Sequence, residues 1–354
     1  MKGGTATLIL LDIIFLKTCK ESGVLHSNHP LYNLAALSVT DLLCEYQRCH
    51  ALTYSACINT LPKIMEVSSQ AIRMGGHIYY IGSESAAILG CIDASEMPDT
   101  YGAPFDQIRA FVSGGWTALD NYDGDLSSCS RLHRIGLDHF IEDILPSLTS
   151  KDSVVVLVSS SGKYANEEVV TVTRMVKKTD AVMSYLISSS QEEDEFLLNN
   201  PFGIKEKSDY YSFVKIPIDH DGFHDLAIKL MTNAVSTYSQ AAGRGAIYKS
   251  FMISTGPANN KIYSRCIDLI SSNLNVSKKD ANVSIIRSVY GVDVVDKALL
   301  EAPQSECIKA ALLSEDKRNQ SQIILPVAFL CKSYRYIFIY ICIYIIPYFH
   351  SFVF

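Results

Sequence analysis

The sequence predicts an α/β protein, an α/β/α sandwich around a mostly parallel sheet that is followed by an all-α helical cap. The first observation is a strand–turn–helix–strand unit between Gly75 and Gly115, which is the element that builds parallel sheets. The second is that apolar runs alternate with helical patterns as far as Ala241. The third is that only helical patterns follow Lys261. Such a sheet places its ligand-binding loops at the carboxyl ends of the strands.

The individual elements follow from hydrophobic periodicity and from turn residues. Buried strands are expected over 77–81, 108–112, 153–158, 181–187 and 212–217. Core helices are expected over 61–74, 86–94, 137–145, 167–178 and 223–241, with a long loop over 188–209. The cap helices are expected over 262–274, 279–289, 292–300 and 305–312.

Composition excludes several classes of function. The 354 residues carry a net charge of −6 and no dense basic stripe, which argues against a nucleic-acid partner. Ten cysteines are scattered without a CxxC pair or a Cys/His spacing that builds a zinc site. The sequence therefore predicts reduced thiols, no metal and no cofactor, in a cytoplasmic or nuclear protein.

Both ends of the chain differ from the sequence between them. The apolar stretch from Ala6 to Leu16 is interrupted by Asp12 and lacks small cleavage-site residues, so a buried or amphipathic helix is expected rather than a signal peptide. The apolar tail over 331–354 is broken by Pro347, and its uninterrupted run is shorter than the ~20 residues of a membrane span. We expect this tail to lie outside the fold, with a tail anchor as the alternative.

One motif resembles a bacterial enzyme family. The segment Tyr80–Phe105, with its Asp93-Ala94-Ser95-Glu96 run, Pro98 and the Thr100-Tyr101-Gly102 turn, is similar to the N-acetylmuramic acid 6-phosphate etherases. The core of those enzymes is a sugar isomerase (SIS) domain, so the resemblance implies an SIS-type sandwich here.

Other stretches resemble the glucokinase regulatory protein family. Residues 46–54 and 144–158 are similar to the second SIS domain of that family and its preceding linker, and residues 287–315 are similar to its C-terminal helical cap. Met1–Thr7 resembles the start of the last core helix of its first SIS domain. The resemblance implies a terminal helix of a first SIS domain over 1–20, linker helices over 21–60, an SIS domain over 61–257 and a cap over 258–330.

The same resemblance indicates two candidate ligand residues. Glu96 matches an acid–base Glu of the etherases and a fructose-phosphate contact of the regulatory family. Lys261 matches a Thr/Ser-Asn-x-Lys motif. A Lys at the start of a helix opposes the helix dipole, which favours an anionic partner for Lys261. The alternatives are a Glu bonded to nearby backbone and an ordinary solvated Lys.

The phosphate-binding loops depart from the etherase pattern. Glu84 stands where the second Gly of the first loop belongs, and Ala86 replaces a Ser, which leaves Ser85 as the candidate there. The second loop keeps Ser161 and Gly162. A carboxylate beside a phosphate costs several kcal/mol unless a cation intervenes.

Two further segments bear on whether the chain has a second catalytic Glu and whether it binds a metal. The second catalytic Glu of the etherases falls between residues 120 and 128, where Asp123 and Asp125 stand but no Glu is in register. The run from Asp219 to His224 carries two Asp and two His, and we expect a solvated turn there rather than a metal site.

These observations predict a non-catalytic sensor of sugar phosphates with a role in carbohydrate metabolism. By resemblance it binds and inhibits a glucokinase or another hexokinase-type sugar kinase, and fructose phosphates modulate that inhibition. The family carries a hydrophobic Leu-Phe-Phe hook after its last core strand, which is missing after Val214-Lys215-Ile216-Pro217. The alternative function is an etherase-type lyase with Glu96 as its acid–base residue.

Overall fold

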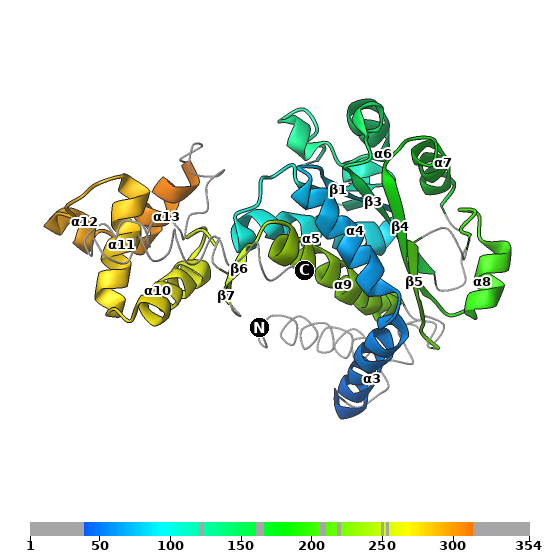
Figure 1. Cartoon of the computed structure of the whole chain (residues 1–354), viewed down its shortest axis with the longest axis horizontal. Coiled ribbons are helices and arrows are strands. Elements are labelled where there is room, and N and C mark those ends of the chain that lie inside the picture. Colours follow the sequence, from blue (N-terminus) through cyan, green and yellow to red (C-terminus); the bar gives the residue numbers. More distant parts are fainter. Residues whose placement is uncertain are drawn as a thin grey trace, which may run out of the picture.

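The computed structural model describes residues 39–119, 124–160, 166–205, 210–217, 221–248, 251–252 and 255–313. Helices are labelled as in Figure 1: α3 Val39–Cys57, α4 Leu61–Arg73, α5 Glu84–Tyr101, α6 Leu137–His139, α7 Glu167–Val176, α8 Glu193–Asn199, α9 Asp221–Tyr238, α10 Asn260–Leu274, α11 Lys278–Tyr290, α12 Lys297–Glu301 and α13 Gln304–Leu313. The strands are β1 Ile78–Gly82, β2 Ile108–Val112, β3 Ser153–Ser160, β4 Val182–Ser189, β5 Tyr210–Lys215, β6 Ile247–Tyr248 and β7 Phe251–Met252.

The central sheet has five strands in the order β2-β1-β3-β4-β5, and every pairing is parallel. β1 lies between β2 and β3 and pairs with both along its whole length. The chain moves from β1 outward to β2 and then crosses back to β3. The strand order therefore reverses between β1 and β3, which is where open α/β sheets bind ligands. The predicted α/β sandwich with a parallel sheet is confirmed.

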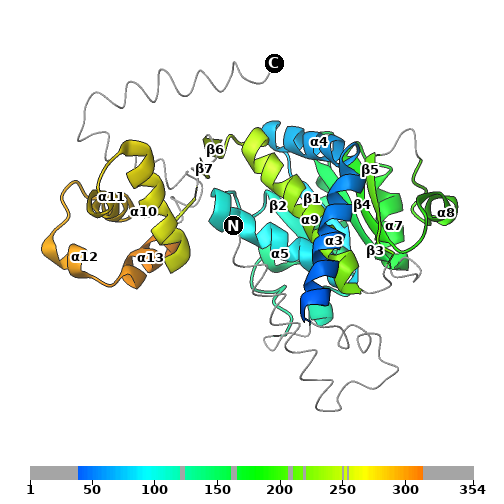
Figure 2. The same cartoon turned by 90° about the horizontal axis from the view of Figure 1, so that it is seen from below.

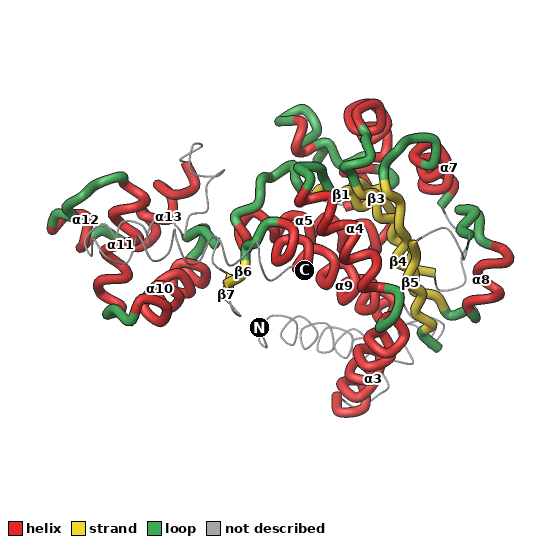
Figure 3. Tube along the Cα trace, viewed as in Figure 1, coloured by secondary structure: helices red, strands yellow, loops and turns green. Residues whose placement is uncertain are grey.

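Helices cover both faces of this sheet (Figures 1 and 2). Tyr80 of β1 packs into the core under α4, α5 and α9, whereas its neighbours Tyr79 and Ile81 pack into the core under α6 and α7. The division follows from the strand geometry, since successive side chains point to opposite faces. Near-continuous apolar strands are typical of a parallel sheet buried on both sides, and Figure 3 shows the strands enclosed between helices.

Helix α5 lies close against the sheet and is longer than the sequence predicted. A Cβ added at Gly90 would come within 2.9 Å of Leu157 Cδ1, so this glycine permits the close approach. The helix continues through Pro98 to Tyr101 because Met97 and Tyr101 are buried and anchor its last turn. The prediction that the helix ends near Ala94 is thus wrong, and Glu96 lies within the helix rather than after it.

Two further elements were not predicted. The expected loop over 188–209 contains α8, whose first turn holds Glu193, Asp194 and Glu195 and whose Phe196 is buried against β5. Acidic residues in a first helical turn are stabilised by the helix dipole, so the charge run indicated a helix start. The second element is the short antiparallel β6–β7 pair between α9 and α10.

The four C-terminal helices, which the sequence predicted as an all-α cap, have a core of their own. Side-chain caps mark three helix starts, where Asn259, Ser277 and Asp296 accept backbone N–H bonds. In Figures 1 and 2 these helices stand beside the α/β domain, next to β6 and β7. Their buried residues are Ile262, Tyr263, Cys266, Leu269, Ile270, Ala281, Ile285, Ile286, Cys307 and Ile308.

The predictions for the two ends of the chain, over 1–38 and over 314–354, lie outside the described residues. Within the described ranges, every helix is too short or too polar to cross a bilayer.

Asp152 ties the start of β3 to the start of β1. Its carboxylate accepts the backbone N–H groups of His77 and Thr149 at 3.0 and 2.9 Å, the Thr149 hydroxyl, and a contact from His77 Nδ1. Burial acts to raise the pKa of Asp152, but these hydrogen bonds outweigh it and hold the pKa below its ordinary value.

We predict that Asp152→Asn lowers the free energy of unfolding by about 2 kcal/mol at pH 7, because an amide has one acceptor oxygen where the carboxylate has two. A depressed pKa means that this stabilisation is complete above the ordinary Asp pKa of about 3.9 and is lost as the pH falls through the folded-state value. Urea unfolding at pH 7 and pH 3 should therefore show the difference shrink at pH 3. The exposed Asp106→Asn is the control, and a difference that stays constant with pH would contradict the assignment.

Helix α5 begins on a residue in the left-handed conformation. Glu84 has φ of 52° and is exposed. Asn275, the other described non-glycine residue with positive φ, caps the end of α10, where Asn is a common choice. A Glu in this conformation is strained by about 1 kcal/mol or more.

We predict that Glu84→Gly raises the free energy of unfolding by about 0.5–1 kcal/mol relative to Glu84→Ala. Both variants lose the carboxylate from the helix start, so their difference isolates the backbone strain. Equal stability of the two variants in urea unfolding would rule out strain at this position.

Candidate functional site

The expected phosphate loops lie at the carboxyl edge of the sheet, on either side of the β1/β3 switch point. Gly82 ends β1, and Ser83 and Glu84 lead into α5. Ser160 ends β3 on the other side. Ser161 and Gly162, the candidate residues of the second loop, lie outside the described residues and stay predictions.

Serine hydroxyls at this edge donate their hydrogen bonds to carboxylates. Ser85 Oγ donates to Asp225 Oδ1 of α9 at 2.7 Å. Ser113, which follows β2, donates to the Glu168 carboxylate at the start of α7. Glu84 adds a third carboxylate at the start of α5. The edge is therefore rich in negative charge where an anion-binding loop would present donors.

Glu96 lies at the other end of α5. Eleven residues separate it from Ser85, which at 1.5 Å per residue places it roughly 16 Å further along the helix axis. Because α5 runs antiparallel to the strands, Glu96 stands toward their amino ends. The candidate residues therefore divide between two ends of the domain, with Ser85 at one and Glu96 at the other.

Glu96 shares a cation with a buried carboxylate. Lys229 Nζ of α9 lies 3.2 Å from Asp93 Oδ1 and 3.5 Å from Glu96 Oε2. Asp93 is fully buried, and its other oxygen accepts the Tyr80 hydroxyl at 3.3 Å. Burial raises the pKa of Asp93, and the charge of Lys229 opposes that rise. The Glu96 side chain is 53% exposed, so it is held on one side and open to solvent on the other.

Lys261 is brought to the same end of the domain as Glu96. It is exposed in the first turn of α10, where Asn259 caps the helix by accepting the N–H of Ile262 at 2.9 Å. The segment before it is tied to the end of α5, since Thr255 Oγ1 donates to the Thr100 carbonyl at 2.7 Å. Thr100 lies one turn beyond Glu96.

The run from Asp219 to His224 differs in part from the expected solvated turn. His224 is fully buried within α9, and its Nδ1 lies 2.9 Å from Ser188 Oγ. The expectation of a solvated turn is wrong for His224, because this residue faces the sheet from the first turn of the helix. Asp219 and His220 lie outside the described residues, and among the described residues no group of three potential ligands gathers at one point.

Asp125 is the described acidic residue of the segment where the etherases carry their second Glu. Its pKa is lowered by hydrogen bonds from the side chain and backbone of Ser127. A general acid needs the opposite shift, toward the operating pH. Asp123 lies outside the described residues.

Sequence reasoning missed Lys229 and Asp93. Asp93 belongs to the Asp-Ala-Ser-Glu run, but only Glu96 of that run was singled out. The signal for Lys229 was a single Lys beside the apolar positions Leu226 and Leu230 of a predicted core helix. A Lys at such a position needs a carboxylate partner, because a buried charge is costly when unpaired.

Comparisons with known proteins agree with this architecture. The family model of the second SIS domain of glucokinase regulatory protein matches residues 54–194, and the model of the C-terminal lid domain of glucokinase regulatory protein matches residues 249–337. The two ranges together span more than half of the chain.

The individual relatives include glucokinase regulatory proteins and N-acetylmuramic acid 6-phosphate etherases. The chain is 25% identical over 337 residues to the glucokinase regulatory protein of Xenopus laevis, in an alignment that covers 93% of this chain and 51% of that protein. It is 24% identical over 276 residues to an N-acetylmuramic acid 6-phosphate etherase of Clostridium botulinum, which covers 75% of this chain and 83% of the enzyme. Among solved structures, the phosphoheptose isomerase GmhA of Neisseria gonorrhoeae aligns with a TM-score of 0.40 and 14% identity, over 56% of this chain and 96% of that one.

The chain thus spans about half the length of the glucokinase regulatory proteins that it matches. The SIS match falls on the α/β domain and the lid match on the helices from α10 to α13. The chain belongs to the glucokinase regulatory protein family, of which it carries the second SIS domain and the C-terminal lid domain.

Proposed function

We propose that this chain acts as a non-catalytic, sugar-phosphate-sensing regulator that binds and inhibits a glucokinase or another hexokinase-type kinase. Fructose phosphates modulate the inhibition, and the protein works in the cytoplasm or nucleus. Membership of the family supports the regulatory role, while the ligand and the partner kinase are carried over from the relatives.

The observation that carries this proposal is the set of carboxylates at the carboxyl edge of the sheet. A phosphate placed at the start of α5 would face Glu84 and Asp225, and Ser85 already donates to Asp225. Two unit charges of like sign at 4 Å repel by about 1 kcal/mol in water and about 4 kcal/mol near a protein surface. A sugar phosphate is therefore disfavoured at the domain's own switch point, and Ser85 as a ligand stays a prediction that must overcome its bond to Asp225.

Glu96 and Lys261 suit a different arrangement. Both stand at the amino ends of the strands, one on α5 and one at the start of α10. We propose that they contact a fructose phosphate held mainly by another SIS domain, with Lys261 on the anionic part of the ligand and Glu96 on its hydroxyls. The ligand then changes how the two SIS domains pack, and a coupling of about 1–3 kcal/mol would suffice to alter kinase affinity.

We propose that the segment after β5 influences which kinase is bound, because the family carries its hydrophobic hook there. Ile216, directly after the strand, is buried, so the chain returns to the core where the family carries its hydrophobic hook. The proposal therefore includes glucokinase and other hexokinases as partners.

The second candidate function is an N-acetylmuramic acid 6-phosphate etherase. Glu96 favours it, since it is held by Lys229 and open to solvent, and so does the similarity to the etherases. The lowered pKa of Asp125 argues against a second general acid in the expected segment.

We predict that Lys261→Ala weakens fructose 6-phosphate binding about tenfold or more in a chain fused to a first SIS domain of the family. A charge-assisted contact of about 1.5–3 kcal/mol would be lost. Calorimetry measures the affinity, and Lys279→Ala, an exposed Lys on the next helix, is the matched control. Equal affinity in the Lys261 variant and in the control would remove Lys261 from the site.

We predict that incubation with N-acetylmuramic acid 6-phosphate releases no D-lactate. An enzymatic lactate assay measures the product. Release that is abolished by Glu96→Gln would replace the regulator with the etherase. Release that persists in Glu96→Gln, purified in the same way, would come from a contaminating enzyme.

A further inference from the structure

Lys229 contacts two carboxylates of α5 at once, and these carboxylates differ in their surroundings. Its Nζ atom lies 3.2 Å from Asp93 Oδ1 and 3.5 Å from Glu96 Oε2. Asp93 is fully buried, whereas the Glu96 side chain is 53% exposed. Residues at i and i+3 of a helix lie on the same face. One cation therefore connects the interior of the domain with a candidate ligand contact on its surface.

Neutralising the buried carboxylate accounts for only one of these two contacts. Asp93 pairs with Lys229, and its other oxygen accepts the Tyr80 hydroxyl at 3.3 Å. Burial raises the pKa of Asp93, and the nearby charge of Glu96 raises it further, whereas Lys229 and a hydrogen bond from Ser236 act to lower it. The closeness of Glu96 is thus unfavourable for the charge on Asp93. The effect of the second contact must therefore be sought at Glu96.

Lys229 restricts where the Glu96 carboxylate can lie. Like charges at this spacing on a helix repel, so without a cation the Glu96 carboxylate would turn away from Asp93 into solvent. An ammonium group has three N–H donors, and Lys229 donates to both carboxylates. Its side chain comes from α9 and is 27% exposed. The carboxylate of Glu96 is therefore held by a neighbouring helix.

The helix that supplies Lys229 is fixed against α5 at two further points. Ser85 Oγ donates to Asp225 Oδ1 at 2.7 Å near the start of both helices. Tyr101 Oη donates to Thr237 Oγ1 at 3.3 Å at their ends. These contacts keep the two helices together on either side of Lys229, so its ammonium group reaches α5 from a defined position.

A side chain that is held before a ligand arrives loses less conformational freedom on binding. Ordering a long, flexible side chain at a binding site reduces affinity, and fixing it in advance avoids that loss. A carboxylate has two oxygens and about four acceptor positions, so Glu96 can accept from Lys229 and still accept from hydroxyl groups of a ligand.

We propose that Lys229 is a positioning residue, which holds the Glu96 carboxylate in the orientation that accepts hydrogen bonds from the ligand hydroxyls. The inference rests on the proposed function, in which Glu96 contacts a fructose phosphate. Lys229 acts through Glu96 and does not itself touch the ligand. Its removal therefore weakens ligand binding only while the Glu96 carboxylate is present.

The test is a double-mutant cycle on Lys229 and Glu96 in the full chain fused to a first SIS domain of the family, with fructose 6-phosphate as the probe. Lys229→Met alone would leave a buried carboxylate without its cation, so every chain in the cycle also carries Asp93→Asn. Lys229→Met is expected to weaken binding about three- to tenfold, the usual cost of ordering one long side chain. In a chain that also carries Glu96→Gln, it should change the affinity by less than about twofold.

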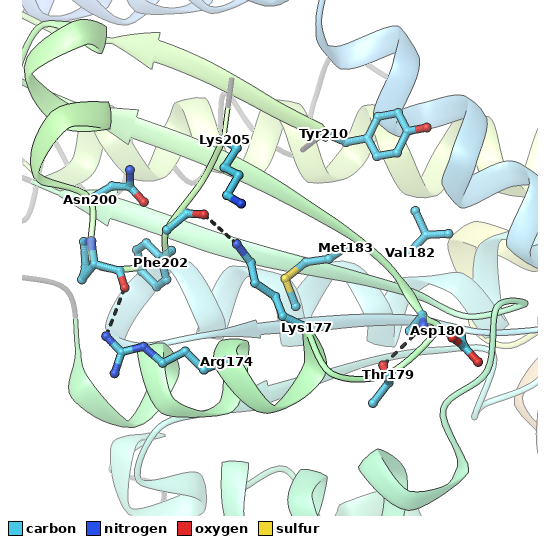
Figure 4. Close-up of a pocket in the computed structure, with 13 residues that line it drawn as sticks. Arg174, Lys177, Thr179, Asp180, Val182, Met183, Asn200, Phe202, Lys205 and Tyr210 are labelled. Carbon is cyan, nitrogen blue, oxygen red and sulfur yellow. Dashed lines mark hydrogen bonds between the residues drawn. The ribbon is translucent and has the colours of Figure 1, made fainter. Parts of the chain in front are cut away.

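The matched control is Lys177→Met in the same background. Lys177 donates to the Gly203 carbonyl at 2.9 Å and lines a cavity of about 850 Å³ that does not include Glu96 (Figure 4). Its replacement also removes one positive charge, and the affinity for fructose 6-phosphate should stay within about twofold of the reference chain. Calorimetry measures each affinity, and thermal unfolding shows that each variant is folded.

The cycle separates failure of this inference from failure of the proposed function. No loss from Lys229→Met, or an equal loss with and without Glu96→Gln, would overturn the positioning role while the contact of Glu96 stands. An equal loss in Lys177→Met would assign the effect to the net charge of the domain and overturn the positioning role as well. Unchanged affinity in Glu96→Gln alone would overturn the proposed contact of Glu96 and, with it, the role of Lys229.

Discussion

Strand β1 pairs with a strand on each side and contributes side chains to the cores on both faces of the sheet, and the rest of the structure depends on this constraint. It pairs with β2 and β3 along its full length, and its successive residues Tyr79 and Tyr80 belong to different cores. A register shift of one residue would exchange those cores, so the sheet admits a single arrangement. The switch point beside β1 and the direction of α5 follow from it.

Helix α5 runs between the two ends of the domain, and it carries different polar residues at each end. Its start carries Glu84 and Ser85 at the carboxyl edge, and its last turns carry Asp93 and Glu96. The buried Asp93–Lys229 pair fastens the helix to α9. A buried carboxylate of this kind is strongly destabilising without its partner, which makes the pair a structural support for the exposed Glu96.

The carboxyl edge of the sheet keeps its hydrogen bonds although carboxylates stand beside its serine hydroxyls. The hydroxyls of Ser85 and Ser113 have carboxylate partners from α9 and α7, so the loops remain hydrogen-bonded. The left-handed backbone at Glu84 is a conformation that favours glycine, and it survives with a residue that does not prefer it. A sheet buried on both faces over-determines this turn, which is how local strain persists in a folded protein.

The sequence by itself determined the strands, most helices and the family, because buried apolar runs and helical periodicity are local signals. It also named Glu96 and Lys261 through motifs. Only the tertiary structure decided that Ser85 and Glu96 lie at different ends, that Lys229 joins Asp93 to Glu96, and that His224 is buried. These outcomes depend on contacts between residues more than a hundred positions apart or on the packing of one helix against the sheet, and no local pattern encodes such distances. The extension of α5 past Pro98 has the same cause, since buried Met97 and Tyr101 outweigh the local cost of proline.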